Sequence, residues 1–155
     1  MRLTSFTDFG LRALMRLASD PDRAFSTAEL ATEFALSRNH LTKIIAKLAQ
    51  ESIVHTQRGS GGGAKLARSP GEIRLGDVVR ILEADQPLVD CFSSSGGDCT
   101  IKSCCRLKTR LQAAEKTFLT ELDRSTLADV ALPVPAALTA SGHPTTSGRN
   151  SLRSL

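Results

Sequence analysis

Apolar residues recur every three or four positions through the first fifty residues, which is the period of an amphipathic helix. A first helix is predicted over roughly residues 5–19. Its apolar stripe comprises Leu3, Phe6, Leu14 and Leu17, and two further apolar residues, Leu11 and Ala18, lie at the edge of that stripe. Ser26 and Glu29 fit a capping box at the start of a second helix, which ends near residues 35–36. That helix is expected to bury three side chains, Leu30, Ala31 and Phe34.

A third helix is predicted directly after Ser37, which is a good N-cap residue. Its apolar stripe comprises Leu41, Ile44, Ile45 and Leu48. Asn39, Lys43 and Lys47 then face away from that stripe. Only a short turn separates the second and third helices. This spacing is typical of a helix-turn-helix, whose second helix enters the major groove of DNA.

Residues 53–67 predict a β-hairpin with a basic, glycine-rich tip. Residues 53–56 and 64–67 have strand character, and the segment 58–63 between them is Arg-Gly-Ser-Gly-Gly-Gly. Such a hairpin after a helix-turn-helix is a wing. A phosphate-binding nucleotide loop is disfavoured, because the GxxxxGK[ST] spacing is missing.

The second half of the chain predicts a short helix, a cysteine-bearing segment and one long helix. Residues 73–82 suit the short helix, while residues 85–103 are rich in Gly, Ser, Asp and Cys and are too polar to bury. The apolar residues of the long helix recur almost as heptads, at Leu107, Leu111, Ala114, Phe118 and Leu122. This stripe suits pairing with a second copy of the chain, or packing against the first helix of the same chain.

These patterns together predict a mainly α fold with a small β-hairpin, a winged helix-turn-helix followed by a long C-terminal dimerisation helix. We expect a winged-helix DNA-binding domain over residues 1–84, a cysteine segment over 85–105, the dimerisation helix over 106–130 and a disordered tail over 131–155. The tail is expected to be disordered because it is rich in Pro, Ser, Thr and Gly.

Positive charge is concentrated around the third helix and the wing. The chain has a net charge of +4, and residues 37–68 hold six Lys or Arg against one Glu. A localised basic face favours phosphate backbones, although an ordinary solvated face has the same composition. The candidate DNA contacts lie at the start of the third helix and on the wing: Ser37, Arg38, Asn39, His40, Lys43, Arg58 and Lys65. His40 could instead pair with polar groups of neighbouring helices.

The cysteines indicate a ligand or redox role rather than structural disulfides. Charged residues, Asp8, Arg12 and Arg16, interrupt the apolar residues near the N-terminus, so we expect no signal peptide, no membrane contact and a cytoplasmic location. In a reducing compartment, cysteines act more often as ligands or reactive thiols. An enzyme, such as a small electron carrier, is disfavoured because no second substrate-binding domain is present.

Several segments resemble the Rrf2 family of transcription regulators over roughly residues 1–130. They are the opening LTSFTDFGLRAL over 3–14, SRNHL over 37–41, the Arg58-Gly59 wing, IRLGDVV over 73–79 and CRLK over 105–108. The similarity is greatest to the nitric-oxide-sensing members of the family. It implies a dimeric winged-helix repressor that holds an iron-sulfur cluster and leaves its promoters when nitric oxide attacks that cluster.

The resemblance also implies a ligand set of three cysteines and one carboxylate from the other subunit. The matching positions are Cys91, Cys99, Cys105 and Asp8. A 4Fe-4S cluster is favoured as the form that responds to nitric oxide, and a 2Fe-2S cluster is compatible with the same ligands. The ordinary role for Asp8 is an ion pair with Arg12, one helical turn away.

Two departures from the family pattern affect the ligand set. The gap between Cys91 and Cys99 is long, with an insertion-like Ser and Gly run at 93–97, and Cys104 stands beside Cys105 as a spare thiol or substitute ligand. Cluster-biogenesis regulators of the family use a histidine three residues after their last cysteine, where this chain has Lys108. The alternatives are a winged-helix regulator that senses redox state or zinc through its thiols, or a sensor of cluster status.

Overall fold

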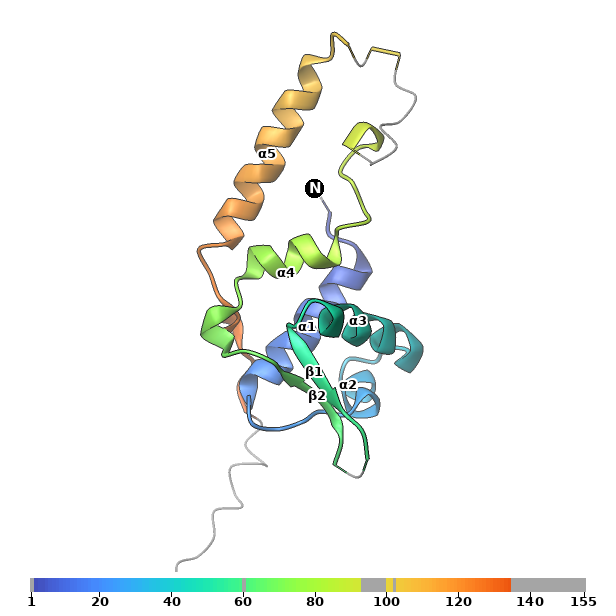
Figure 1. The fold of residues 1–155 in the computed structure, drawn as a ribbon, viewed down its shortest axis with the longest axis vertical. Coiled ribbons are helices and arrows are strands. Elements are labelled where there is room, and N and C mark those ends of the chain that lie inside the picture. Colours follow the sequence, from blue (N-terminus) through green and yellow to red (C-terminus); the bar gives the residue numbers. More distant parts are fainter. Residues whose placement is uncertain (1, 60, 93–99, 102, 135–155) are drawn as a thin grey trace, which may run out of the picture.

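The computed structural model describes residues 2–59, 61–92, 100–101 and 103–134 (Figure 1). Its helices and strands are α1 (Ser5–Ser19), α2 (Thr27–Glu33), α3 (Arg38–Gln50), β1 (Val54–Gln57), β2 (Gly63–Leu66), α4 (Leu75–Leu82) and α5 (Arg106–Leu122). Short 3₁₀ turns are η1 (Pro70–Glu72), η2 (Asp90–Phe92) and η3 (Leu127–Val130). The predicted architecture, mostly helical with one small antiparallel hairpin, is confirmed.

The hydrophobic core forms where α1 and α3 meet, with α4 and the hairpin closing it. Leu14 and Leu17 of α1 and Leu41, Ile44 and Leu48 of α3 are at most 1% exposed. These are the residues that the helical period selects. Burying a Leu or Ile side chain contributes about 1.5 to 3 kcal/mol, so the two stripes fix α3 firmly on the rest of the domain.

The helix caps differ in detail from those the sequence predicts. The Ser26 hydroxyl accepts the backbone N–H of Glu29 as expected. The Glu29 carboxylate, however, pairs with Arg23. Ser37 occupies the N-cap of α3, but its side chain makes no capping hydrogen bond. The first turn of α3 is therefore held by other contacts.

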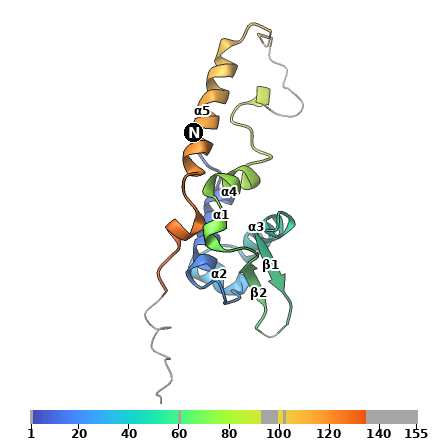
Figure 2. The same ribbon diagram turned by 60° about the vertical axis from the view of Figure 1, so that its left-hand side comes forward.

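The hairpin has the predicted position and is tied to the loop before α2. β1 and β2 are antiparallel, with Val54 opposite Leu66. In the tip, Gly59 and Gly61 have φ values of 103° and 78°, a region that favours glycine. The N–H of Phe25 donates to the carbonyl of Ala64 at 2.9 Å, and the reverse bond is 2.8 Å. Figure 2 shows the hairpin and α3 on the same side of the molecule, away from α5.

The long helix α5 extends beyond the core and has no fully buried residue. None of its residues is buried, and Leu107 is 62% exposed. Its main contact is with α4, whereas η3, which follows it, lies against α1. The buried Leu127 of η3 donates its N–H to the carbonyl of Ile73 at 2.8 Å. It is therefore η3, rather than α5, that packs on α1. Within the apolar stripe of α5, Leu107 and Ala114 are exposed, while Leu111, Phe118 and Leu122 are half-buried.

Some predicted features fall outside the described residues. They are Cys99, the insertion-like run at 93–97 and the tail from residue 135 onward. No helix among the described residues is long and apolar enough to cross a membrane.

Candidate DNA interface and cysteine site

One face of α3 is solvent-exposed and lies opposite its buried stripe. The side chains on this face are Arg38, Asn39, Thr42, Lys43 and Ala46, and Ser37 just before the helix is exposed too. The exposed face thus begins in the first turn, the part of a recognition helix that reaches base edges. Thr42 was not among the sequence candidates. Its position, four residues after Arg38 and off the apolar stripe, is the signal that identifies it.

The turn between α2 and α3 is short because Ala35 takes a left-handed conformation, with a φ of 53°. This conformation costs roughly 1 to 2 kcal/mol for a residue other than glycine. The N–H of Leu36 donates to the carbonyl of Ala31 at 2.8 Å and holds the turn closed. The angle between the two helices, and so the presentation of α3, depends on this turn.

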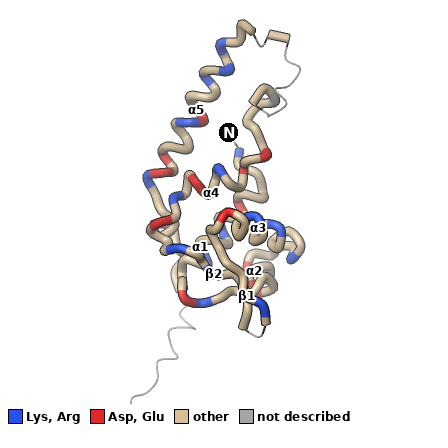
Figure 3. The backbone as a smooth tube through the Cα atoms, in the orientation of Figure 1, with Lys and Arg blue, Asp and Glu red and all other residues tan. Residues whose placement is uncertain are grey.

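Lys and Arg positions occur along α3 and at the hairpin (Figure 3). Arg58 is exposed at the tip. Lys65 lies at the base of the hairpin with its Nζ 3.7 Å from an oxygen of Asp22. Lys47 lies 3.8 Å from an oxygen of Asp85. Arg58 is therefore accessible to a phosphate. Lys65 would exchange its exposed partner Asp22 for a phosphate at little cost, because an exposed ion pair is weak.

His40 is placed differently from the other candidates on α3. Its ring stacks on Phe6 of α1 with centroids 6.0 Å apart, and meets Phe9 edge-on at 5.5 Å. The side chain is half-buried. It contacts α1 while its neighbours Arg38 and Asn39 face solvent.

Two cysteines of the segment over 85–105, Cys91 and Cys105, are half-buried. Cys91 lies in η2, and Cys105 is the N-cap residue of α5; neither forms a disulfide. Cys104 is exposed, with its sulfur 3.6 Å from the carbonyl of Ile101. Among the described residues, no three Cys, His, Asp or Glu side chains gather at distances suited to a metal ion. The structure of one chain therefore does not bring Asp8 together with Cys91 and Cys105.

Asp8 lies on the accessible side of α1 and forms the ion pair that its spacing suggests. Its Oδ2 is 2.8 Å from the guanidinium of Arg12, and the two side chains are 47% and 51% exposed. A second contact joins Nε of Arg12 to Oδ1 at 3.3 Å. An exposed pair of this kind is worth no more than about 0.5 kcal/mol. Asp8 is thus accessible to another partner at small cost.

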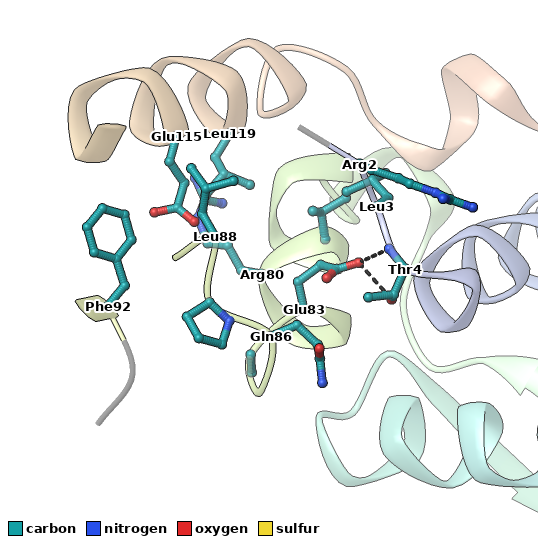
Figure 4. A pocket seen from close by; sticks show the side chains of 13 residues that line it. Arg2, Leu3, Thr4, Arg80, Glu83, Gln86, Leu88, Phe92, Glu115 and Leu119 are labelled. Atoms are coloured by element: carbon teal, nitrogen blue, oxygen red, sulfur yellow. Dashed lines mark hydrogen bonds between the residues drawn. The ribbon is translucent and has the colours of Figure 1, made fainter. Parts of the chain in front are cut away.

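The start of α1 is fastened to the end of α4 by Glu83. One carboxylate oxygen of Glu83 accepts both the backbone N–H of Thr4 at 2.8 Å and its hydroxyl at 2.9 Å. Thr4 is the N-cap residue of α1. These groups line a groove of about 530 Å³ between α1, α4, α5 and the segment toward η2 (Figure 4). The first turn of α1, with Asp8, is therefore positioned through α4.

A second connection joins α4 to the end of α5. Arg80 donates to both carboxylate oxygens of Asp123, at 2.8 and 2.5 Å. The hydrogen bond from Arg80 lowers the pKa of Asp123. Gly76 of α4 permits the helices to approach, since a Cβ there would lie 2.7 Å from the carbonyl oxygen of Leu119 and would also collide with Asp123.

Comparison with known proteins decides the family. Residues 3–132 match the model of the Rrf2 family, described as iron-dependent transcriptional regulators. The chain belongs to the Rrf2 family. The structure of IscR from T. potens is similar to this Rrf2 chain, with 28% identity, a TM-score of 0.64 and coverage of 83% of this chain and 85% of that one.

Two further structures share the fold. CymR of B. subtilis, described as its global cysteine regulator, has 24% identity and a TM-score of 0.65 over 84% of this chain and 96% of CymR. The oxidised form of CymR from Staphylococcus aureus has 21% identity and a TM-score of 0.65 over 88% and 100% of the two chains. The winged-helix fold of this Rrf2 chain is thereby confirmed. Rrf2 proteins are DNA-binding transcription regulators rather than enzymes, and they commonly form dimers.

The donor set of this Rrf2 chain suits iron. Iron-sulfur groups are held by cysteine thiolates, and two thiols that form no disulfide, Cys91 and Cys105, flank the cysteine segment. A carboxylate, such as that of Asp8, is a harder ligand that gives a more labile site. Since Asp8 does not meet the two cysteines within one described chain, a shared site requires a second subunit.

Proposed function

We propose that this Rrf2 regulator is a repressor that binds double-stranded promoter DNA as a homodimer and releases it in response to nitric oxide. The observation that carries the DNA-binding part is the exposed polar face of α3, which lies opposite the buried stripe of the same helix. Ser37, Arg38, Asn39 and Lys43 contact base edges or phosphates at this face. Arg58 and Lys65 of the wing contact the phosphate backbone.

The exposed stripe of α5 supports the homodimer. Leu107 at the start of α5 is 62% exposed, and Ile101 in the segment before this helix is 56% exposed. Pairing with a second copy through the stripe would remove such apolar surface from water. The helix α5 (Arg106–Leu122), which makes up most of the predicted dimerisation segment 106–130, joins the two copies. The winged-helix domain over 1–84 of each copy presents one α3. Two copies of α3 then meet successive major grooves, about one helical turn of DNA apart.

The signal is received at residues 85–105, through Cys91, Cys99, Cys105 and Asp8 of the second subunit. This is the ligand set implied by the similarity to the nitric-oxide sensor NsrR. A bound iron-sulfur cluster, of the 4Fe-4S or 2Fe-2S type, supplies iron that nitric oxide attacks. Cys105 begins α5, and α5 packs on α4. A change of ligation at Cys105 therefore acts directly on the helix that joins the subunits.

A regulator that senses redox state or zinc through its thiols is the second candidate. The exposure of Cys104 next to Cys105 favours it, because accessible thiols are the ones that oxidise or bind zinc. A sensor of cluster status like IscR is the third candidate, supported by the similarity to IscR. Lys108, where such regulators have a histidine, speaks against it.

Measurement of iron and sulfide content and of the visible absorption spectrum, on anaerobically purified protein, distinguishes an iron-sulfur regulator from a thiol or zinc sensor. We expect coloured protein with sulfide, and loss of the colour in Cys105→Ser. Cys104→Ser is the matched control, because the neighbouring thiol remains, and it should keep the colour. Zinc sites and disulfides are colourless, so a colourless protein that gains no iron on reconstitution would leave the thiol or zinc sensor.

A further inference from the structure

The first turns of α1 and α3 are joined by a cluster of aromatic rings. His40 of α3 lies against Phe6 and Phe9 of α1, with centroid distances of 6.0 and 5.5 Å. Its arrangement with Phe9 is edge-to-face, at an interplanar angle of 81°. Both distances lie in the range in which aromatic pairs attract beyond simple burial. The imidazole is therefore engaged within the protein and is not presented to solvent like its neighbours.

The start of α3 lacks a side-chain cap. The first backbone N–H groups of a helix have no partner within the helix, and a side chain at the N-cap usually accepts one of them. The side chain of Ser37 makes no such bond. The turn before it includes Ala35 in a left-handed conformation. The start of α3, where Arg38 and Asn39 are exposed, thus depends on contacts made farther along the first turn.

The cluster extends on its other side to Asp8. The guanidinium of Arg12 lies over the ring of Phe9, 5.8 Å from its centroid. The same guanidinium is paired with Asp8 at 2.8 Å. Asp8, Arg12, Phe9 and His40 form a continuous series of contacts from the accessible side of α1 to the start of α3.

We propose that His40 is a positioning residue, which holds the first turn of α3 against Phe6 and Phe9 and so sets Arg38 and Asn39 for DNA. This role differs from the direct DNA contact that the sequence predicts for His40. It rests on the proposed use of α3 as the DNA-reading helix, and it requires neither iron nor nitric oxide.

The substitutions His40→Phe and His40→Ala separate a positioning role from a DNA contact. Phenylalanine keeps a ring that packs on Phe6 and Phe9 but has no hydrogen-bonding nitrogen. We expect His40→Phe to keep the affinity for a duplex selected by the wild-type protein from a random-sequence pool, within about twofold. His40→Ala and Phe9→Leu should each lose about fivefold, as expected for an aromatic pair. The double variant should lose no more than either alone, because the two residues act through one contact.

Affinity for an unselected duplex at the same salt concentration separates loss of positioning from loss of folding. A displaced first turn lowers binding to the selected duplex and leaves binding to the unselected one, whereas unfolding lowers both. The inference is overturned if His40→Phe loses as much as His40→Ala while Phe9→Leu binds normally, since His40 then contacts DNA itself. It is equally overturned if His40→Ala has no effect. Should Arg38→Ala still weaken binding in either case, α3 remains the reading helix. If the wild-type protein selects no duplex at all, the proposed function fails as well.

Discussion

Replacing Gly76 with alanine tests how α5 is attached to the domain. The new Cβ would lie 2.7 Å from the carbonyl oxygen of Leu119 and would collide with the carboxylate of Asp123. Overpacking typically costs about 1 to 3 kcal/mol, and a backbone oxygen yields less readily than a flexible side chain, so the upper value applies. Alanine in a helix recovers about 1 kcal/mol relative to glycine. The net expectation is a loss of about 2 kcal/mol in the free energy of unfolding.

Urea denaturation followed by circular dichroism measures this loss. Gly71→Ala is the matched control. The nearest atom to a Cβ at that position would be the hydroxyl oxygen of Ser69, 4.0 Å away. We expect Gly71→Ala to leave stability unchanged or to raise it by a few tenths of a kcal/mol. A Gly76→Ala variant as stable as Gly71→Ala would refute the close helix crossing, since the propensity gain would then act unopposed.

Three further experiments test the DNA face, the ion pair between Arg80 and Asp123, and the cysteine site. Arg38→Ala should weaken binding to the selected duplex by about 1 to 3 kcal/mol in a competition assay at fixed salt if it reads a base, while Gln50→Ala at the far end of α3 should bind normally. Because the pKa of Asp123 is lowered in the folded state, the stability it contributes is present above its unfolded pKa and is lost as pH falls through the folded value. Asp123→Asn should therefore flatten the dependence of stability on pH below about pH 4, measured by urea midpoints. Cys105→Ser should lose iron in elemental analysis and Cys104→Ser should retain it; the reverse result would assign the ligand to Cys104.

The parts of the fold that follow from local periodicity are those the sequence predicts correctly. Burial of Leu14 in α1 and Ile44 in α3 follows from a 3.6-residue period, because one face of each helix must leave water. The hairpin follows from its glycines, two of which take positive φ values. These signals lie within a few residues of the structure they determine.

Contacts between residues far apart in the chain could not be predicted from the sequence. Glu83 fastens Thr4 across 79 positions, and no local pattern pairs the two. The sequence position of His40, in the first turn of the third helix, predicts a DNA contact. Its ring instead packs against α1, where Phe6 and Phe9 lie about one helical turn apart. Glu29 likewise leaves its expected capping bond for Arg23. In each case the partner is a charged or aromatic residue that lies outside the local sequence pattern.

The decisive experiment on the nitric-oxide response measures binding of the selected duplex to anaerobically purified protein before and after nitric oxide is added. We expect coloured, sulfide-containing protein that holds the duplex and releases it once nitric oxide is added. Colourless protein that gains no colour on reconstitution, and that binds the duplex equally with and without nitric oxide, would contradict the proposed response.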